Sequence, residues 1–328
     1  MKKHYVFFFL VLVTPLIFGQ QSFNPINKNA SPEAKQLLNL FYEIKGKRII
    51  SGQHNYSHHM DKWHAYVKGL TGKSPLIWGA DFSRYYKEEI INSIVMEAIK
   101  RSKDGYIVTL MWHTGRPQDN PPFNWGNSTQ GELTKEEWNN LTTSGTLLHK
   151  KWETRVDSIA FYLKKLKKAN VPILWRPYHE MNGSWFWWGD KKGKEGYVKL
   201  WKMMYNRFVN HHKLDNLIWV WNANAPRNLK NDEAYDYKHY YPGINYVDVL
   251  AADVYHNDFK QSHHDDLLKL GKGKLIALGE VGEVPSPKIL NKQPMWSWFM
   301  IWDKWVETHN TPKEIIEIYS YPKTKSHK

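Results

Sequence analysis

The chain contains no cysteine. This absence excludes disulfide bonds, thiolate metal ligands, a cysteine nucleophile and a lipoprotein anchor. The sequence also lacks the glycine-rich loops GxGxxG and GxxxxGK(S/T), which cradle phosphates, and the GxSxG motif of serine hydrolases. Nucleotide-dependent enzymes and Ser–His–Asp hydrolases therefore have no support in this sequence.

Long apolar runs are missing everywhere except at the N-terminus, where residues 5–18 are almost entirely apolar. Lys2 and Lys3 precede this run, and small or polar residues follow it from Gly19 onward. The pattern is typical of a secretory signal peptide and is too short for a comfortable membrane span. We predict a signal peptide at residues 1–20 and a catalytic domain at residues 21–328. The alternative is an uncleaved anchor.

This segment predicts a secreted or periplasmic protein without stable membrane insertion. The formal net charge of +14 permits a polyanionic partner. However, the lysines are spread along the chain, and a local cluster at residues 164–168 falls on the polar side of a predicted helix. We interpret the charge as a solvated surface and expect no nucleic-acid partner. We also expect a monomer.

Eight short apolar runs alternate with helical or loop sequence. Their continuous apolar character is typical of strands buried on both faces of a parallel sheet. The runs are residues 48–52, 75–79, 105–112, 171–175, 216–221, 246–254, 274–278 and 296–302. The clearest helical patterns between and around them are residues 31–44, 87–100, 152–168, 197–209 and 265–270. This alternation predicts an α/β fold, a single (β/α)8 TIM barrel.

Polar side chains collect where these runs end, and in such barrels those ends share one face. They are His54, Asp81, His113, Glu180, Asn222, Tyr255, Glu280 and Trp302. Glu180 ends the fourth run and Glu280 ends the seventh, so both are expected at one mouth. Two facing carboxyl groups are the machinery of glycoside hydrolysis. The alternative is two unrelated ion-paired glutamates.

The neighbours of the two glutamates suggest different roles for them. Aromatic residues around Glu180 are expected to raise its pKa, which suits a general acid and base. Arg176 is expected to hold Glu280 ionised, and the Tyr255 hydroxyl to orient it. The seventeen tryptophans provide flat faces for sugar rings, although they are also good core residues.

The sixteen histidines raise a metal alternative. His54, His58 and His59 could ligate zinc, as could His263 and His264. None of these sets has the spacing of HExxH or another known ligand motif. We therefore predict no metal and no cofactor.

Residues 175–189, WRPYHEMNGSWFWWG, together with GEVG at residues 279–282, resemble glycoside hydrolase family 26. The resemblance extends from about Ile49 to Trp302. It implies a clan A barrel, a retaining double-displacement mechanism and, for most members, endo-β-1,4-mannanase activity. By this resemblance Glu180 is the acid/base and Glu280 the nucleophile.

The resemblance also implies a set of substrate contacts. His113 and His179 match residues that contact the sugar at the cleavage point, and Trp185 matches an aromatic on the leaving-group side. Tyr255 matches the tyrosine that hydrogen-bonds the nucleophile. Trp302, with Trp296 or Trp298 as alternatives, matches the platform under the sugar. Arg176 and Asp253 complete the expected substrate-binding set.

The implied partner is a β-mannan polysaccharide. The alternatives within the family are a β-1,3-xylanase and a mixed-linkage β-glucanase, and outside enzymes the alternative is a non-catalytic glycan-binding barrel. The predicted loop at residues 118–146 is expected to influence substrate choice, because loops of that length in compact domains are usually functional.

Overall fold

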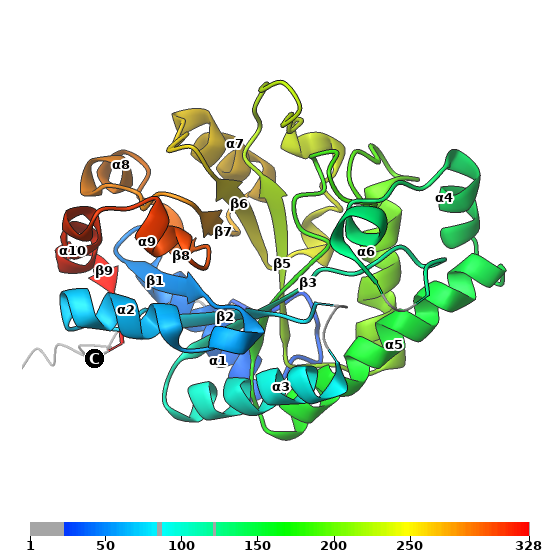
Figure 1. The fold of residues 1–328 in the computed structure, drawn as a ribbon, viewed down its shortest axis with the longest axis horizontal. Helices are drawn as coiled ribbons and strands as arrows, with labels where there is room; N and C mark the ends of the chain where they lie inside the picture. Colours follow the sequence, from blue (N-terminus) through cyan, green and yellow to red (C-terminus); the bar gives the residue numbers. More distant parts are fainter. Residues whose placement is uncertain (1–22, 84–86, 121–122, 328) are drawn as a thin grey trace, which may run out of the picture.

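The computed structural model describes residues 23–83, 87–120 and 123–327. In these residues eight parallel strands form a closed barrel, in which β8 pairs with β1 and β1 pairs with β2 (Figure 1). The strands are β1 Ile49–His54, β2 Ile77–Asp81, β3 Ile107–Trp112, β4 Ile173–Pro177, β5 Leu217–Asn224, β6 Val249–Val254, β7 Leu275–Val281 and β8 Trp296–Ile301. A short ninth strand, β9 Thr324–Lys325, pairs beside β1. The predicted TIM barrel is confirmed.

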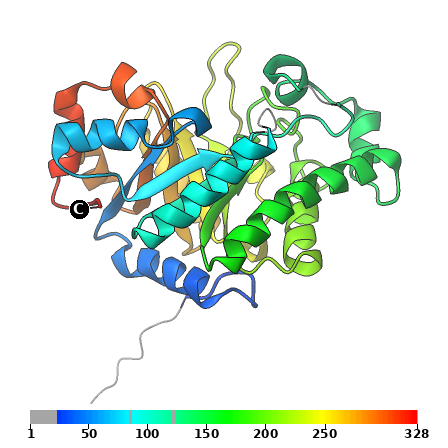
Figure 2. The same cartoon turned by 60° about the horizontal axis from the view of Figure 1, so that its bottom comes forward.

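Helices surround this sheet (Figure 2). They are α1 Pro32–Ile44, α2 Lys62–Thr71, α3 Glu88–Lys103, α4 Lys135–Leu141, α5 Leu147–Lys168, α6 Tyr197–Asn206, α7 Gln261–Gly271, α8 Pro287–Lys292, α9 Trp305–Thr308 and α10 Pro312–Ser320. Among the described residues, none of these helices combines the length and the apolar composition that crossing a bilayer requires. The predicted signal peptide at residues 1–20 lies outside the described residues.

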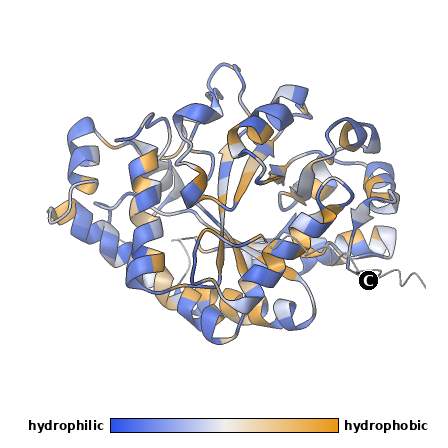
Figure 3. Ribbon diagram, turned by 180° about the vertical axis from the view of Figure 1, so that it is seen from behind, coloured by the Kyte–Doolittle hydropathy of each residue, from blue (hydrophilic) through white to orange (hydrophobic). Residues whose placement is uncertain are grey.

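Every residue of β1 to β8 is buried, as expected for strands covered on both faces. The central strands are accordingly rich in apolar residues, whereas the helices carry polar residues on their outer sides (Figure 3). One apolar cluster fills the space between strands and helices. A second apolar cluster fills the end of the barrel at which the strands begin. Helix α1 covers this end, and the ring centroid of Phe41 in α1 lies 5.1 Å from that of Trp298 in β8.

The first helix shows how local sequence produces this closure. Ser31 caps α1 by accepting a hydrogen bond from the Ala34 amide at 3.2 Å, and Pro32 occupies the first turn. Buried Leu37, Leu38 and Phe41 then recur at helical spacing. The predicted helix at residues 31–44 is confirmed.

Some element boundaries differ from the predictions. The predicted loop at residues 118–146 contains α4, which a capping box between Thr134 and Glu137 begins, and α2 was not predicted at all. Strand β4 ends at Pro177, so Glu180 lies in the loop beyond it, whereas Glu280 lies inside β7. Strand β5 extends through Asn222 to Asn224.

Candidate active site

A cleft of about 450 Å³ lies at the carboxyl ends of the barrel strands. Its lining comes from the strand ends and from the loops that follow them. It includes Tyr56, His113, Trp125, His179, Glu180, Trp185, Phe186, Arg227, Asp232, Tyr255, Glu280, Trp302 and Trp305. The cleft therefore brings together both glutamates and most of the predicted contact residues.

Glu180 lies in a strained turn after β4, with a backbone φ of 52°. This left-handed conformation costs about 1–2 kcal/mol for a non-glycine residue, and a hydrogen bond from its backbone N–H to Asn222 O at 2.8 Å holds it. The Trp185 indole N–H donates to Oε2 at 2.7 Å, and the Asn224 amide donates to Oε1. Burial, followed by the charge of Glu280, raises the pKa of Glu180 to about 7.

Glu280 lies inside β7, and both of its carboxylate oxygens accept hydrogen bonds. Arg176 Nη2 donates to Oε1 at 3.1 Å, and the Tyr255 hydroxyl donates to Oε2 at 2.7 Å. These are the two contacts that the sequence led us to expect. The preceding residue must be glycine, because a Cβ atom at Gly279 would collide with the Asn222 amide.

A buried polar layer lies beneath the two glutamates. Arg176 Nη1 donates to Asn222 Oδ1 at 2.7 Å and to Gly279 O at 2.9 Å. The Asn222 amide in turn donates to Asp253 at 2.6 Å. Burial and the neighbouring Glu280 and Glu180 raise the pKa of Asp253 well above its usual value. Arg176 and Asp253 were both predicted to contact substrate, but both are buried within this layer and neither lines the cleft.

Two histidines form one wall of the cleft, with ring centroids 4.6 Å apart. His113 follows β3, and Asp81 at the end of β2 holds it through Nδ1 at 2.9 Å and through the backbone N–H at 3.0 Å. His179 Nε2 lies 3.8 Å from Glu280 Oε1. Burial, assisted by His113 and Arg176, lowers the pKa of His179 well below its usual value, so its ring is neutral at pH 7.

Trp302 follows β8 and lines the cleft, stacked on the His54 ring at 4.1 Å between centroids. The two alternative platforms point elsewhere. Trp298 is buried against Phe41 of α1, and Trp296 is buried with its indole N–H bonded to Gln293. Of the three candidates, Trp302 is the one placed where a sugar ring can stack.

Four residues in or beside the cleft were not singled out by the sequence: Trp125, Arg227 and Trp305 line it, and Asn224 is buried next to Glu180. Asn224 contacts Glu180, and Arg227 lies over the Trp185 ring at 5.4 Å. Trp305 packs edge-on against Tyr255 at 5.0 Å, and Trp125 packs against His113 at 5.1 Å. The available signal for Asn224 was its position with Asn222 at the end of the fifth apolar run. Arg227 and Trp305 carried none.

Three carboxylates of the site lie close enough together to be compared with a metal-binding group. Among the described residues, one group of three potential metal ligands lies close together. It consists of Glu180, Asp253 and Glu280, each of which has a carboxylate oxygen within 4.8 Å of an oxygen of the other two. Arginine, asparagine, tryptophan and tyrosine donors already bond to these oxygens. The donor set therefore fits hydrogen-bonded carboxylates, and a cation here would compete with the Arg176 guanidinium for Glu280.

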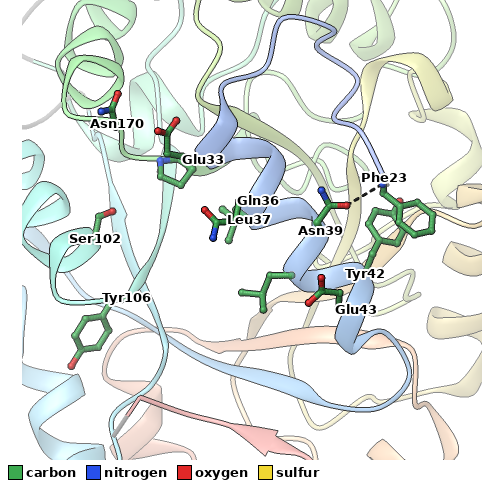
Figure 4. Close-up of a pocket in the computed structure, with 13 residues that line it drawn as sticks. Phe23, Glu33, Gln36, Leu37, Asn39, Tyr42, Glu43, Ser102, Tyr106 and Asn170 are labelled. Atoms are coloured by element: carbon green, nitrogen blue, oxygen red, sulfur yellow. Dashed lines mark hydrogen bonds between the residues drawn. The ribbon is translucent and has the colours of Figure 1, made fainter. Parts of the chain in front are cut away.

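A larger cavity, of about 970 Å³, lies on the outer side of α1 at the opposite end of the barrel (Figure 4). Phe23 stacks on Tyr42 at 3.7 Å along its edge, and the Asn39 side chain accepts a hydrogen bond from the Phe23 N–H at 3.0 Å. None of the candidate site residues lines this cavity. Its size alone does not make it the active site.

A TIM barrel with paired glutamates beyond β4 and in β7, in an aromatic cleft, is a barrel of the glycoside hydrolase class. Residues 26–324 match the profile of glycosyl hydrolase family 26. The chain belongs to this family.

Named relatives support the assignment. A mannan endo-1,4-beta-mannosidase of Thermothelomyces thermophilus is 34% identical over 90% of this chain and 60% of the relative. One from Bacillus subtilis is 30% identical over 86% of this chain and 83% of the relative. The structure of GH26A from Muricauda sp. is 54% identical, with a TM-score of 0.89, and covers 92% of this chain and 98% of that one. The chain spans between 48% and 63% of the length of several curated relatives it matches.

Proposed function

We propose that this protein is a retaining endo-β-1,4-mannanase that is exported through its N-terminal signal sequence. The observation that carries the mechanism is the closeness of Glu180 and Glu280, which have carboxylate oxygens within 4.8 Å of each other. Retaining glycosidases place the two carboxyl groups about 5–5.5 Å apart, whereas inverting enzymes need about 6.5–9.5 Å to admit a water molecule. The relatives from Thermothelomyces thermophilus and Bacillus subtilis are mannan endo-1,4-beta-mannosidases, which supports β-1,4-mannan as the substrate.

In the first step Glu280 attacks the anomeric carbon, and the glycosidic bond breaks as Glu180 transfers its proton to the leaving oxygen. This forms a covalent mannosyl-enzyme ester. In the second step Glu180, now ionised, takes a proton from water, whose oxygen displaces Glu280 from the anomeric carbon. The raised pKa of Glu180 keeps its proton available near neutral pH.

The remaining side chains support these two steps. Trp302 provides a flat face for the sugar ring at the cleavage point, and His113 and His179 line the wall beside it. The Tyr255 hydroxyl orients the Glu280 carboxylate. Trp185 donates a hydrogen bond to Glu180, and the resemblance to family 26 assigns it to the leaving-group side.

The test is the release of reducing ends from linear β-1,4-mannan, galactomannan, β-1,3-xylan and mixed-linkage glucan. Proton NMR of the first product then gives the stereochemistry. We expect activity on the mannans and initial formation of the β-anomer. Activity on xylan or glucan alone would replace the substrate assignment, and an initial α-anomer would overturn the retaining mechanism. Folded protein without activity on any glycan would favour a glycan-binding barrel.

Export has its own test. Expression of the whole chain in a bacterial host, followed by N-terminal sequencing of the protein recovered outside the cytoplasm, should show a mature chain that begins near Gln20 or Gln21. A chain that retains Met1 in the membrane fraction would support the uncleaved anchor instead.

A further inference from the structure

The loop that follows β5 is tied to the loop that carries Glu180. Arg227 and Ala234 exchange two backbone hydrogen bonds, of 3.0 and 2.9 Å, and Ala234 also pairs with Gly183. The Asn182 side chain accepts from the Asn224 N–H at 2.8 Å and donates to Asn224 O at 2.7 Å. In Figure 1 this loop rises above β5. The two loops therefore hold each other in place at the edge of the cleft.

Within this junction, Arg227 contacts both residues that donate hydrogen bonds to Glu180. Its Nη1 donates to Asn224 Oδ1. Because arginine has no acceptor, the Asn224 oxygen must face it, and the Asn224 amide N–H is left to donate to Glu180. The same guanidinium lies 5.4 Å from the Trp185 ring, whose N–H donates to the other Glu180 oxygen.

Arg227 is itself fixed from the loop tip. Its side chain is 9% exposed, and its Nε and Nη2 atoms form a two-pronged pair with the Asp232 carboxylate. His256 Nε2, from the loop after β6, lies 3.6 Å from Asp232. A buried guanidinium held by a carboxylate in this way is rigid as well as charged.

We propose that Arg227 is a positioning residue that locks the two hydrogen-bond donors of Glu180 and, opposed by Asp232, sets the pH at which Glu180 releases its proton. This inference rests on the proposed role of Glu180 as the acid/base. The geometry requires opposite effects of the two partners, since Arg227 brings a positive charge toward Glu180 and Asp232 offsets that charge.

The charges around Glu180 give the expected signs. Glu280 and Asp253 face it from β7 and β6, and the Tyr255 side chain faces it from the end of β6. Arg227 lowers the pKa of Glu180 against the raising effects of burial and Glu280. Removing Arg227 should therefore raise the pKa of Glu180, so that the fall of activity on the alkaline side of the pH profile begins at a higher pH. Removing the charge of Asp232 moves it to lower pH.

The experiment compares pH profiles of kcat/KM on β-1,4-mannan. We expect Arg227→Met to shift the alkaline limb upward by about half a pH unit to one pH unit and to lower kcat about tenfold. Asp232→Asn should shift the limb downward by a smaller amount. Arg227→Lys should keep the alkaline limb near its wild-type pH but still lower kcat. Lysine keeps the positive charge, but its single ammonium group cannot form the two-pronged pair with Asp232.

Arg207→Met provides the matched control. Arg207 forms a similar two-pronged pair with Asp157 at 2.8 and 2.6 Å, but on the outside of the barrel. We expect this variant to lower stability and to leave the pH profile unchanged. A limb that stays in place in both Arg227→Met and Asp232→Asn, or that moves the same way in both, overturns the proposal.

A second readout separates this proposal from the proposed function. Carbon-13 NMR of protein labelled at the glutamate δ-carbons, with Glu180 assigned from Glu180→Gln, follows its titration without any substrate. If no glycan is cleaved but the Glu180 titration moves upward in Arg227→Met and downward in Asp232→Asn, the positioning role stands and the mannanase assignment fails. If Arg227→Met does not fold, the other two variants decide the question: Asp232→Asn should move the Glu180 titration downward, and Arg227→Lys should lower kcat while leaving that titration near its wild-type position.

Discussion

The two glutamates of the cleft are held by different parts of the fold. Glu280 lies inside β7, and its partners Arg176 and Tyr255 come from β4 and from the residue that follows β6. Glu180 lies in a loop with a positive φ, and its donors are Trp185 in the same loop and Asn224 at the end of β5. The sheet therefore places one carboxylate, whereas contacts among loops place the other.

This difference has a chemical meaning in the proposed mechanism, in which Glu280 is the nucleophile and Glu180 the general acid. A nucleophile must approach the anomeric carbon from a fixed direction, and a hydrogen-bonded strand gives that rigidity. A general acid must exchange protons at working pH, so its surroundings have to tune its pKa as well as its position. The loops around Glu180 can change such tuning without disturbing the barrel.

The largest effect should come from Glu280→Ala. In the proposed mechanism Glu280 is the nucleophile and its loss removes the covalent step, so we expect kcat/KM on mannan to fall by more than about 10⁴-fold. Activity should be equally low on an aryl mannobioside with a dinitrophenyl leaving group, because that substrate still needs attack at carbon. Glu195→Ala, an exposed glutamate, serves as the control and should retain full activity.

Glu180→Ala should separate the two roles. On mannan we expect a loss of about 10²–10⁴-fold, since the leaving sugar then departs without a proton. On the dinitrophenyl substrate, formation of the enzyme ester should be much less affected, because that leaving group needs no protonation. Stopped-flow measurement of the dinitrophenolate burst tests this. Equal losses on both substrates would contradict the acid/base role.

Tyr255→Phe tests the support of the nucleophile. It removes the 2.7 Å hydrogen bond to Glu280 and keeps the ring that packs on Trp305. We expect a loss of about 10²-fold in kcat, comparable with the removal of one donor from other active sites. Tyr241→Phe is the matched control, because the buried Tyr241 hydroxyl has no hydrogen-bond partner within residues 23–83, 87–120 and 123–327. A loss confined to KM would argue against this role of Tyr255.

The pH profile should report the tuned carboxylate. The pKa of Glu180 is raised to about 7, and the proposed mechanism requires its proton in the first step. As pH rises above about 7, kcat/KM should therefore fall about tenfold for each pH unit. Initial rates on mannan between pH 4 and pH 9 measure this limb. An alkaline limb retained by Glu180→Ala would assign it to another group.

The smallest expected effect is on stability. The folded-state pKa of Glu180 is above its usual value, so the folded state binds the proton more tightly and stability falls as pH rises from about 4.5 to about 7. Glu180→Gln should therefore raise Tm by a few degrees at pH 8, with little gain at pH 4. Glu280→Gln should lower Tm at pH 8, since it weakens a buried pair with Arg176. Thermal melts of wild type and both variants at pH 4 and pH 8 test these expected changes in Tm.

The barrel itself was readable from the chain because each strand is a continuous apolar run. Burial on both faces produces apolar runs that are too short for helices, and the run at residues 105–112 contains the strand Ile107–Trp112. Helix α4 escaped prediction although the capping-box sequence from Thr134 to Glu137 was present, because the loop around it is otherwise polar.

In the site, the contacts of Glu280 with Arg176 and Tyr255 were anticipated, since each residue falls at a strand end. The contacts of Glu180 were only partly anticipated. The aromatic neighbour Trp185 is close in sequence, whereas Arg227 reaches Glu180 through Asn224 and across two loops. Such contacts depend on how loops of irregular backbone fold on one another, for which no sequence periodicity exists.

Short-range sequence thus specifies the strands, the cap of α1 and the residue types available at each strand end, because these depend on neighbours a few positions apart. Only the closed barrel decides which side chains meet. Glu180 and Glu280 are 100 positions apart in sequence. The barrel brings a carboxylate oxygen of each to within 4.8 Å of the other and buries both side chains. Burial and like charge then raise the pKa of Glu180, an effect that no local sequence pattern contains.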